Sequence, residues 1–194
     1  MSPITLAVKK LQIEKVAKKI ASTGKKPEKK RHIVYAHAVA WTVFLVLIPS
    51  LLIELSCWTE SKIGMNSCSQ YSPVGIPFII FGLFLIFWTA YTQDKIGNGT
   101  PVQTIPTQKL IINGPYKYVR NPMAAGIIFY YFGIAFFLDH PAMVLIFTPI
   151  YVIIALFNLK FIEEKELEHR FGEEYKEYKN HVPMILPVRK TGKS

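Results

Sequence analysis

Two short stretches of the sequence hold side chains that could take part in chemistry. The first, residues 114–122, reads GPYKYVRNP and ends on Arg120, Asn121 and Pro122. Asn favours the N-cap of a helix and Pro its first turn, so Arg120 is expected beside the free N–H groups of a helix N-terminus. Such a terminus can hold an anion. Taken alone, the stretch is also explained by a helix cap and a cation that extends to the water interface.

The second stretch is acidic. Glu163 and Glu164 begin the charged helical run EEKELE, with Lys160 within pairing distance on the same helix. A run of this kind is commonly an ordinary solvated helix face. If the two stretches lie at the same edge of a membrane, however, a cationic and aromatic turn meets a pair of carboxylates. The sequence then predicts a polar pocket that opens toward lipid.

Long apolar blocks must position these residues. A helix needs about 20 mostly apolar residues to cross the hydrocarbon core of a bilayer. The blocks are residues 33–55, 74–92, 124–138 and 142–158, the last two separated by Asp-His-Pro. Buried helices of a soluble core are the alternative, but four such blocks in 194 residues favour a membrane protein.

The sequence therefore predicts an all-α integral membrane protein with about four transmembrane helices. The third is expected to be short and to form a helical hairpin with the fourth. An amphipathic N-terminal helix and a C-terminal helix with a tail complete a single domain of residues 1–194. Its parts are a basic amphipathic segment (1–32), two spans (33–92), a loop (93–121), the hairpin (122–158), and the helix and tail that complete the pocket (159–194).

The distribution of charge predicts the orientation. The formal net charge is +10, and residues 1–32 alone hold ten Lys and Arg. Because lysine and arginine concentrate in cytoplasmic loops, both termini and the 93–121 loop are expected in the cytoplasm. The competing interpretation is a basic patch that binds RNA. Lysines that flank membrane spans are the commoner cause, so no nucleic-acid partner is expected.

Cysteine and histidine give weaker indications. Cys57 and Cys68 are the two cysteines, and both fall in the loop 56–73, which the charge distribution places outside the cytoplasm. A disulfide there and two free thiols are both compatible with the sequence. No Cys and His cluster has the spacing of a zinc site, so no metal is expected.

The two stretches together resemble a known family. GPYKYVRNPMAAG, a hydrophobic hairpin and EEKELEHRFGEEYKEYKNHVPMILP are similar to the C-terminal half of isoprenylcysteine carboxyl methyltransferases and their prokaryotic relatives, over roughly residues 107–187. The resemblance implies an integral-membrane enzyme that transfers a methyl group from S-adenosylmethionine and releases S-adenosylhomocysteine. It also implies a lipophilic small-molecule or lipidated acceptor that enters from the bilayer, such as the carboxylate of a prenylated cysteine.

The resemblance further implies which residues serve the reaction. Arg120 and Glu164 take the catalytic positions, with Arg120 holding the acceptor oxyanion in line with the methyl group. The cofactor-binding positions fall on Gln108, Lys109, Leu110, Ile111, Tyr116, Asn121, Pro122, Met123, Ala124, Glu163, His181 and Leu186. In this scheme a carboxylate such as Glu163 pairs with the cofactor ammonium, and the C-terminal segment around His181 closes over the cofactor.

The sequence departs from the family pattern on the substrate side. Asn121 stands where the motif has histidine, and Ala124 stands where it has a second tyrosine. Leu159 stands where the family has an arginine that is taken to meet the substrate. A carboxylate acceptor is already ionised and needs no strong base, whereas an amine would first be deprotonated, by Glu164 or His181. The methyl donor is therefore better specified than the acceptor.

Other functions are compatible with parts of the sequence. A phospholipid N-methyltransferase, acting on a lipid such as phosphatidylethanolamine, would use the same cofactor. A sterol-reductase-like protein shares a similar C-terminal plan with NADPH, but the short chain and the RNP turn argue against it. A non-catalytic protein that recruits anionic lipids through the lysines of residues 1–32 is the third alternative.

Overall fold

A computed structural model describes residues 35, 38–65, 71–97 and 109–187 of the chain. Three of its helices are long and apolar enough to cross a membrane, and a fourth apolar helix is shorter. The long helices are Ala38–Lys62, Gly75–Ile96 and Met143–Phe171, and the shorter one is Pro122–Phe137. The predicted all-α, multi-pass membrane architecture with a short third helix is thereby confirmed. The expected N-terminal amphipathic helix lies outside the described residues.

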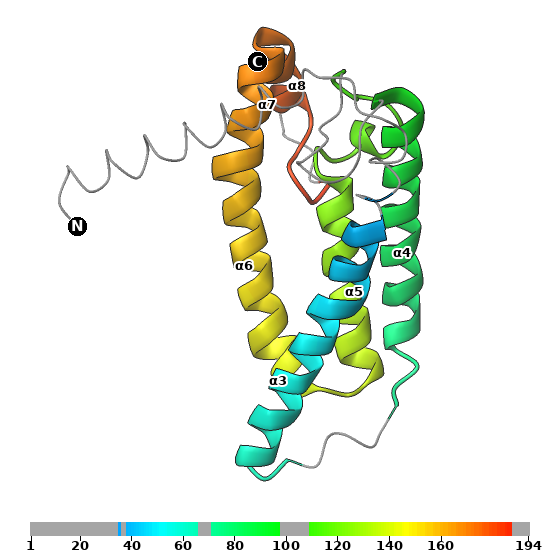
Figure 1. The fold of residues 1–194 in the computed structure, drawn as a ribbon, viewed down its shortest axis with the longest axis vertical. Coiled ribbons are helices and arrows are strands. Elements are labelled where there is room, and N and C mark those ends of the chain that lie inside the picture. The colour runs from blue at the N-terminus through cyan, green and yellow to red at the C-terminus, as the bar shows by residue number, and fades with distance from the viewer. Residues whose placement is uncertain (1–34, 36–37, 66–70, 98–108, 188–194) are drawn as a thin grey trace, which may run out of the picture.

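Each long helix contains π-helical as well as α-helical turns. In chain order the elements are a π turn (Val43–Leu47), α3 (Ile48–Lys62), α4 (Gly75–Thr92), a π turn (Gln93–Gly97), a 3₁₀ turn (Gly114–Lys117), α5 (Pro122–Phe137), a π turn (Met143–Phe147), α6 (Thr148–Asn158), a π turn (Leu159–Glu163), α7 (Glu164–Phe171) and α8 (Glu173–His181). Figure 1 shows α6 and α7 as one continuous rod. The last membrane helix therefore carries its residues from the bilayer to the polar end of the molecule without a break.

α4 and α5 pack along their length because glycines let the two backbones approach each other. A Cβ on Gly82 would lie 2.6 Å from the backbone nitrogen of Tyr130, and a Cβ on Gly126 would lie 2.9 Å from the carbonyl oxygen of Gly82. Helices in a bilayer associate through close packing of this kind, since lipid tails are as apolar as leucine. A larger residue at Gly82 would push the helices apart.

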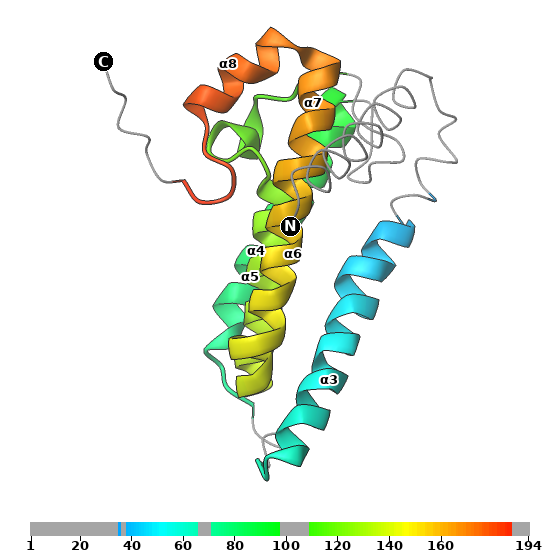
Figure 2. The ribbon, with the colours of Figure 1, turned by 90° about the vertical axis from the view of Figure 1, so that its left-hand side faces the viewer.

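Two tyrosines of α5 hold α3 to the other helices. The Tyr131 hydroxyl donates to the Phe44 carbonyl at 2.8 Å, and the Tyr130 hydroxyl donates to the Leu45 carbonyl at 3.1 Å. Both carbonyls belong to the first π turn, and a carbonyl without a partner is costly in a bilayer. Figure 2 shows that α3 diverges from α6 in the direction of its own N-terminal end.

A buried contact between Glu60 and His140 closes the end of the bundle farthest from α7 and α8. Glu60 of α3 is fully buried, and its Oε2 lies 2.8 Å from Nδ1 of His140 in the turn after α5. Its Oε1 accepts the N–H of Ala142 at 2.9 Å, at the start of the last long helix. Cys57 is near this pair, with its Sγ 3.7 Å from His140 Nε2. Cys68 lies outside the described residues, so the choice between a disulfide and two free thiols is not tested.

The C-terminal segment, residues 172–187, folds back over the start of α5. Gly172 separates α7 from α8, and its φ of +56° is a backbone conformation that favours glycine. After α8 the chain pairs with the RNP turn, because the Arg120 N–H donates to the Pro183 carbonyl at 2.9 Å and the Asn121 N–H to the Met184 carbonyl at 3.0 Å. The two stretches that the sequence singled out are therefore in direct contact.

Candidate functional site

A cavity of about 300 Å³ lies between the apolar helices and the turn at residues 114–122. One part of it is apolar and is lined by Ala40, Trp41, Phe44, Leu45, Ile86, Ile127, Ile154 and Ala155. Nearer the ends of the same helices the lining becomes polar, with Gln93, Tyr116, Arg120, Asn121, Asn158 and Glu163. We call these two parts the apolar chamber and the polar wall. The cavity thus joins a lipid-like environment to a set of charged and hydrogen-bonding groups.

Arg120 is fixed in the polar wall by a buried carboxylate. Its Nη2 lies 2.6 Å from Glu164 Oε1, and its Nη1 donates to the Lys179 carbonyl at 3.1 Å. Glu164 is 3% exposed, and its Oε2 lies 2.6 Å from Lys179 Nζ, which also reaches Glu168 at 2.9 Å. Although burial lowers the pKa of the Lys179 ammonium, the two carboxylates raise it overall. Glu164 therefore joins the turn to α8 through two cations.

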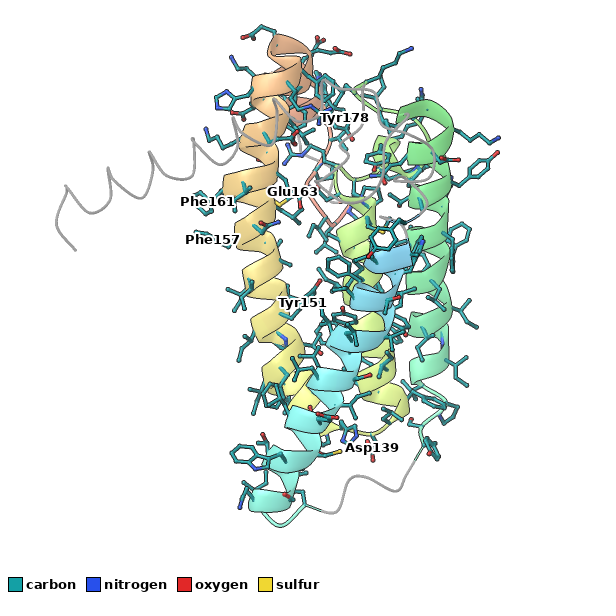
Figure 3. The ribbon with its side chains drawn as sticks, in the orientation of Figure 1. Asp139, Tyr151, Phe157, Phe161, Glu163 and Tyr178 are labelled. Atoms are coloured by element: carbon teal, nitrogen blue, oxygen red, sulfur yellow. The ribbon has the colours of Figure 1, made fainter. Side chains whose placement is uncertain are left out.

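Glu163, the neighbouring carboxylate, lines the cavity instead. The π turn that ends at Glu163 holds one more residue than an α-helical turn. The extra residue keeps Glu163 on the same side as Asn158, whose Nδ2 donates to Glu163 Oε1 at 3.0 Å. In Figure 3, Tyr151 and Glu163 point toward the interior of the bundle, whereas Phe157 and Phe161 point away from it.

The C-terminal segment secures the turn from the other side. The Tyr178 hydroxyl donates to the Tyr116 carbonyl at 2.6 Å. Burial raises the pKa of Tyr116, Tyr175 and Tyr178 above the ordinary value of 10.0. These phenols therefore stay neutral at physiological pH.

Three buried polar atoms of the wall have no hydrogen-bond partner among the described residues. They are Gln93 Oε1, Arg120 Nε and Asn121 Nδ2, one acceptor and two donors. An unsatisfied buried polar atom costs about 1–3 kcal/mol. All three residues line the cavity, so a polar ligand there would relieve this cost.

The structure brings together part of the expected site around the cavity. The residues of the expected set that line it are Tyr116, Arg120, Asn121, Pro122, Met123, Ala124 and Glu163. Asn121 takes the N-cap position of α5 and Pro122 the first helical position, as the sequence predicts, although the Asn121 side chain makes no capping bond. That side chain is therefore available to the cavity.

The other expected residues lie apart from the cavity lining. Glu164 stands behind Arg120, and Ile111 is buried elsewhere, with Leu110 partly buried and Lys109 exposed beside it. His181 is exposed, with its Nδ1 2.9 Å from the carbonyl oxygen of Glu177 in its own helix. Leu186 is 59% exposed. Gln108 is outside the described residues.

Sequence reasoning missed the contributions of residues 40–45, which precede α3, and of α4 and α6 with the residue after α4. Gln93 is the first polar side chain after the block 74–92, and Asn158 ends the block 142–158, which is the signal that could have identified both. Trp41 stacks on Phe87 of α4 with ring centroids 5.3 Å apart. Nothing in the sequence distinguishes that tryptophan from the other aromatic residues of the spans.

The arrangement can hold a ligand that has both charged and apolar parts. A carboxylate, a guanidinium, a phenol and three amides form the polar wall of the cavity, and aliphatic and aromatic side chains surround the apolar chamber. Glu163 can offset a positive charge, while the unpartnered donors of Arg120 and Asn121 can meet a negative one. The site is thus suited to bring a polar, zwitterionic molecule next to an apolar one.

Comparison with known proteins gives matches to methyltransferases. Residues 71–174 match the family model described as phospholipid methyltransferase. The methanethiol S-methyltransferase of Pseudomonas deceptionensis is 26% identical over 166 residues, which cover 82% of this chain and 59% of that protein. The protein-S-isoprenylcysteine O-methyltransferase of Xenopus laevis is 28% identical over 152 residues, covering 72% and 50%. The rat protein of that name, from Rattus norvegicus, is 26% identical over 145 residues, covering 70% and 50%. The chain spans between 50% and 59% of the length of these three relatives.

Proposed function

Because the chain belongs to the phospholipid methyltransferase family, we propose that it transfers a methyl group from S-adenosylmethionine to a lipophilic acceptor that enters from the bilayer. Its similarity to protein-S-isoprenylcysteine O-methyltransferases confirms the resemblance seen in the sequence. The observation that carries the proposal is the cavity, in which a polar wall with unpartnered buried atoms adjoins an apolar chamber.

The polar wall fits the charges of this cofactor. S-adenosylmethionine supplies an electrophilic methyl group on a sulfonium, and it carries an ammonium and a carboxylate. Glu163 provides the negative charge that the cationic groups need, and Arg120 and Asn121 provide donors for the carboxylate. The N-terminus of α5, which begins at Pro122, adds free N–H groups on the same side.

The chain's own residues would act mainly by orientation and by excluding water. Methyl transfer is an in-line displacement, so alignment of donor and acceptor supplies most of the rate. Glu164 and the Lys179 carbonyl hold the Arg120 guanidinium in one place, which leaves its Nε as a fixed donor on the cavity wall. The apolar chamber can hold the apolar part of the acceptor and keep water from the reacting atoms.

For the acceptor we favour a lipophilic carboxylate, such as that of a prenylated cysteine. It is ionised at neutral pH and therefore needs no general base. A thiol is the second candidate, as the similar methanethiol S-methyltransferase is named for one. Leu159 favours it, because this residue is 4% exposed on the cavity wall and brings no cation to the substrate side.

Isothermal titration of the purified protein with S-adenosylhomocysteine tests the methyl donor. We expect S-adenosylhomocysteine to bind and NADPH not to bind. Glu163→Gln should weaken binding, because it removes the negative charge from the cavity wall. Glu173→Gln is the matched control, because its carboxylate is 88% exposed and pairs with Lys176 on the surface. Binding of NADPH in place of S-adenosylhomocysteine would refute the proposal.

Methyl-labelled S-adenosylmethionine identifies the acceptor. A farnesylated cysteine analogue, an alkanethiol and phosphatidylethanolamine are offered separately in vesicles. A base-labile methyl ester on the first is the expected product, and a methylated thioether from the second would select the thiol instead. Labelling of phosphatidylethanolamine would select the N-methyltransferase. If none of the three acquires label while S-adenosylhomocysteine binds, the acceptor is not of the lipophilic classes proposed.

We further place the polar end of the bundle in the cytoplasm, since lysines and arginines concentrate there. In a Cys57→Ser, Cys68→Ser background, single cysteines replace Ser61, at the outer end of α3, and Lys117, in the turn. Both positions are exposed. A membrane-impermeant thiol reagent applied to intact cells should label the first variant and not the second. The reverse pattern would invert the proposed orientation.

A further inference from the structure

The π turn after α4 and the 3₁₀ turn Gly114–Lys117 bring together two neutral polar groups that the mechanism above does not use. Gln93 and Tyr116 both line the cavity, and Gln93 Nε2 donates to the Tyr116 hydroxyl at 2.6 Å. This bond fixes the orientation of the Gln93 amide. Gln93 Oε1 is then buried on the wall without a hydrogen-bond donor from any described residue. The amide therefore offers the cavity one acceptor in a set position.

Tyr116 offers a donor beside that acceptor. Because its hydroxyl oxygen accepts the Gln93 N–H, its own hydrogen is directed elsewhere. The turn that carries Tyr116 is held on two sides. The Tyr116 carbonyl accepts the Tyr178 hydroxyl at 2.6 Å, and Gly114, whose φ is +62°, packs against the Thr92 side chain. Burial raises the pKa of the Tyr116 phenol, so it keeps its proton at physiological pH.

An acceptor and a donor side by side, neither charged, match one part of the proposed cofactor. Its amino-acid end and its sulfonium are charged and fit Glu163, Arg120 and Asn121 on the same wall. Adenine is neutral, and its Watson–Crick edge presents the 6-amino donor next to the ring-nitrogen acceptor N1, an edge that proteins read by hydrogen bonding. The stretch 109–111, in which the resemblance placed cofactor contacts, does not line the cavity.

We propose that Gln93 and Tyr116 form the adenine-reading pair of this protein, with Gln93 Oε1 accepting from the 6-amino group and the Tyr116 hydroxyl donating to the neighbouring ring nitrogen. The assignment rests on the proposed function, since it presupposes an adenosyl cofactor. Gln93 is then a specificity-determining residue that selects the base, while the charged residues of the wall select the amino-acid end.

The unmodified protein provides the first test. S-inosylhomocysteine replaces the 6-amino group with a carbonyl and places a proton on the adjacent nitrogen, so both hydrogen-bonding functions are reversed. By isothermal titration we expect the wild type to bind S-adenosylhomocysteine about 10- to 100-fold more tightly than the inosyl analogue. Equal affinity, or preference for the inosyl analogue, would overturn the proposal. Absence of binding by S-adenosylhomocysteine would overturn the proposed function, and this inference with it.

Two substitutions locate the discrimination. Gln93→Leu keeps the approximate volume and removes the acceptor, so we expect the Kd of S-adenosylhomocysteine to rise about tenfold and the preference over the inosyl analogue to fall to within about threefold of unity. Asn158→Leu makes a matched polar-to-leucine change across the cavity. It should weaken both ligands alike and leave their ratio at the wild-type value. A wild-type ratio in Gln93→Leu would overturn the assignment.

Tyr116→Phe provides an independent check if Gln93→Leu does not fold. It removes the donor and the anchor of the Gln93 amide while keeping the ring, and folding of each variant is verified by its elution volume and melting temperature. We expect the preference for the adenosyl ligand to drop at least about fivefold. An unchanged preference in this variant would refute the role of the pair.

Discussion

Glu164→Gln should destabilise the protein strongly, because Glu164 holds two cations in a buried position. Its oxygens lie 2.6 Å from Arg120 Nη2 and 2.6 Å from Lys179 Nζ, and the side chain is 4% exposed. Glutamine keeps the shape and removes the charge. Removing one partner of a buried ion pair costs about 3–5 kcal/mol. Lys179 retains Glu168 at 2.9 Å, so we expect the lower end of that range, about 3 kcal/mol.

The assay is thermal unfolding in detergent, with S-adenosylhomocysteine binding measured on the same samples. A loss of about 3 kcal/mol corresponds to a fall in Tm of on the order of 10 °C for a chain of this size. Glu163→Gln should show the opposite profile, because Glu163 faces the cavity. Its Tm should change by less than about 3 °C while the Kd of S-adenosylhomocysteine rises about tenfold.

The two adjacent carboxylates are thus expected to separate stability from binding. Glu173→Gln removes an exposed carboxylate that pairs with Lys176 at 2.6 Å, and it should change neither quantity. A Glu164→Gln protein that melts within about 2 °C of wild type would refute the structural role given to this residue. A large fall in Tm for Glu163→Gln would show that the π turn does not direct that carboxylate as described.

Three further predictions concern the rest of the molecule. Gly82→Ala places a Cβ 2.6 Å from the Tyr130 backbone nitrogen, so the free energy of unfolding should fall by about 2 kcal/mol, measured as a lower Tm. Glu60→Gln breaks the buried pair with His140, so Tm should fall while titration shows unchanged S-adenosylhomocysteine affinity, because the pair lies at the far end of the bundle from the cavity. Burial raises the pKa of Tyr175 above 10.0, so the neutral phenol stabilises the fold fully below about pH 10, and this stabilisation is lost as the pH rises further. The Tm should therefore be level from pH 7 to about 9.5 and fall above that pH.

The sequence predicts the membrane architecture well, because each span needs only a sufficient number of apolar residues. It also predicts the start of α5, since Asn121 and Pro122 have strong positional preferences. The convergence of Arg120 with the Glu163–Glu164 pair follows from placing both stretches at one edge of the membrane.

The sequence does not predict which of the two carboxylates faces the cavity. A 3.6-residue period is assumed in reading a helix, and the π turn ending at Glu163 departs from that period. The Glu60–His140 pair joins residues 80 positions apart, with no local pattern to mark it. Gln93 is one polar residue after an apolar run, and its role depends on Tyr116, which comes from a different segment.

The continuous last helix links the site to the thickness of the bilayer. Met143–Phe171 has 29 residues and is about 43 Å long, whereas α5 has 16 residues and is about 24 Å long. A hydrocarbon core of about 30 Å is shorter than the first rod and longer than the second. The rod is charged from Glu163 onward, so its extra length lies outside the hydrocarbon, whereas the short α5 thins the lipid around the helix that follows Arg120. The lipid composition of the membrane thus becomes a determinant of how Arg120 and Glu163 are aligned in the polar wall.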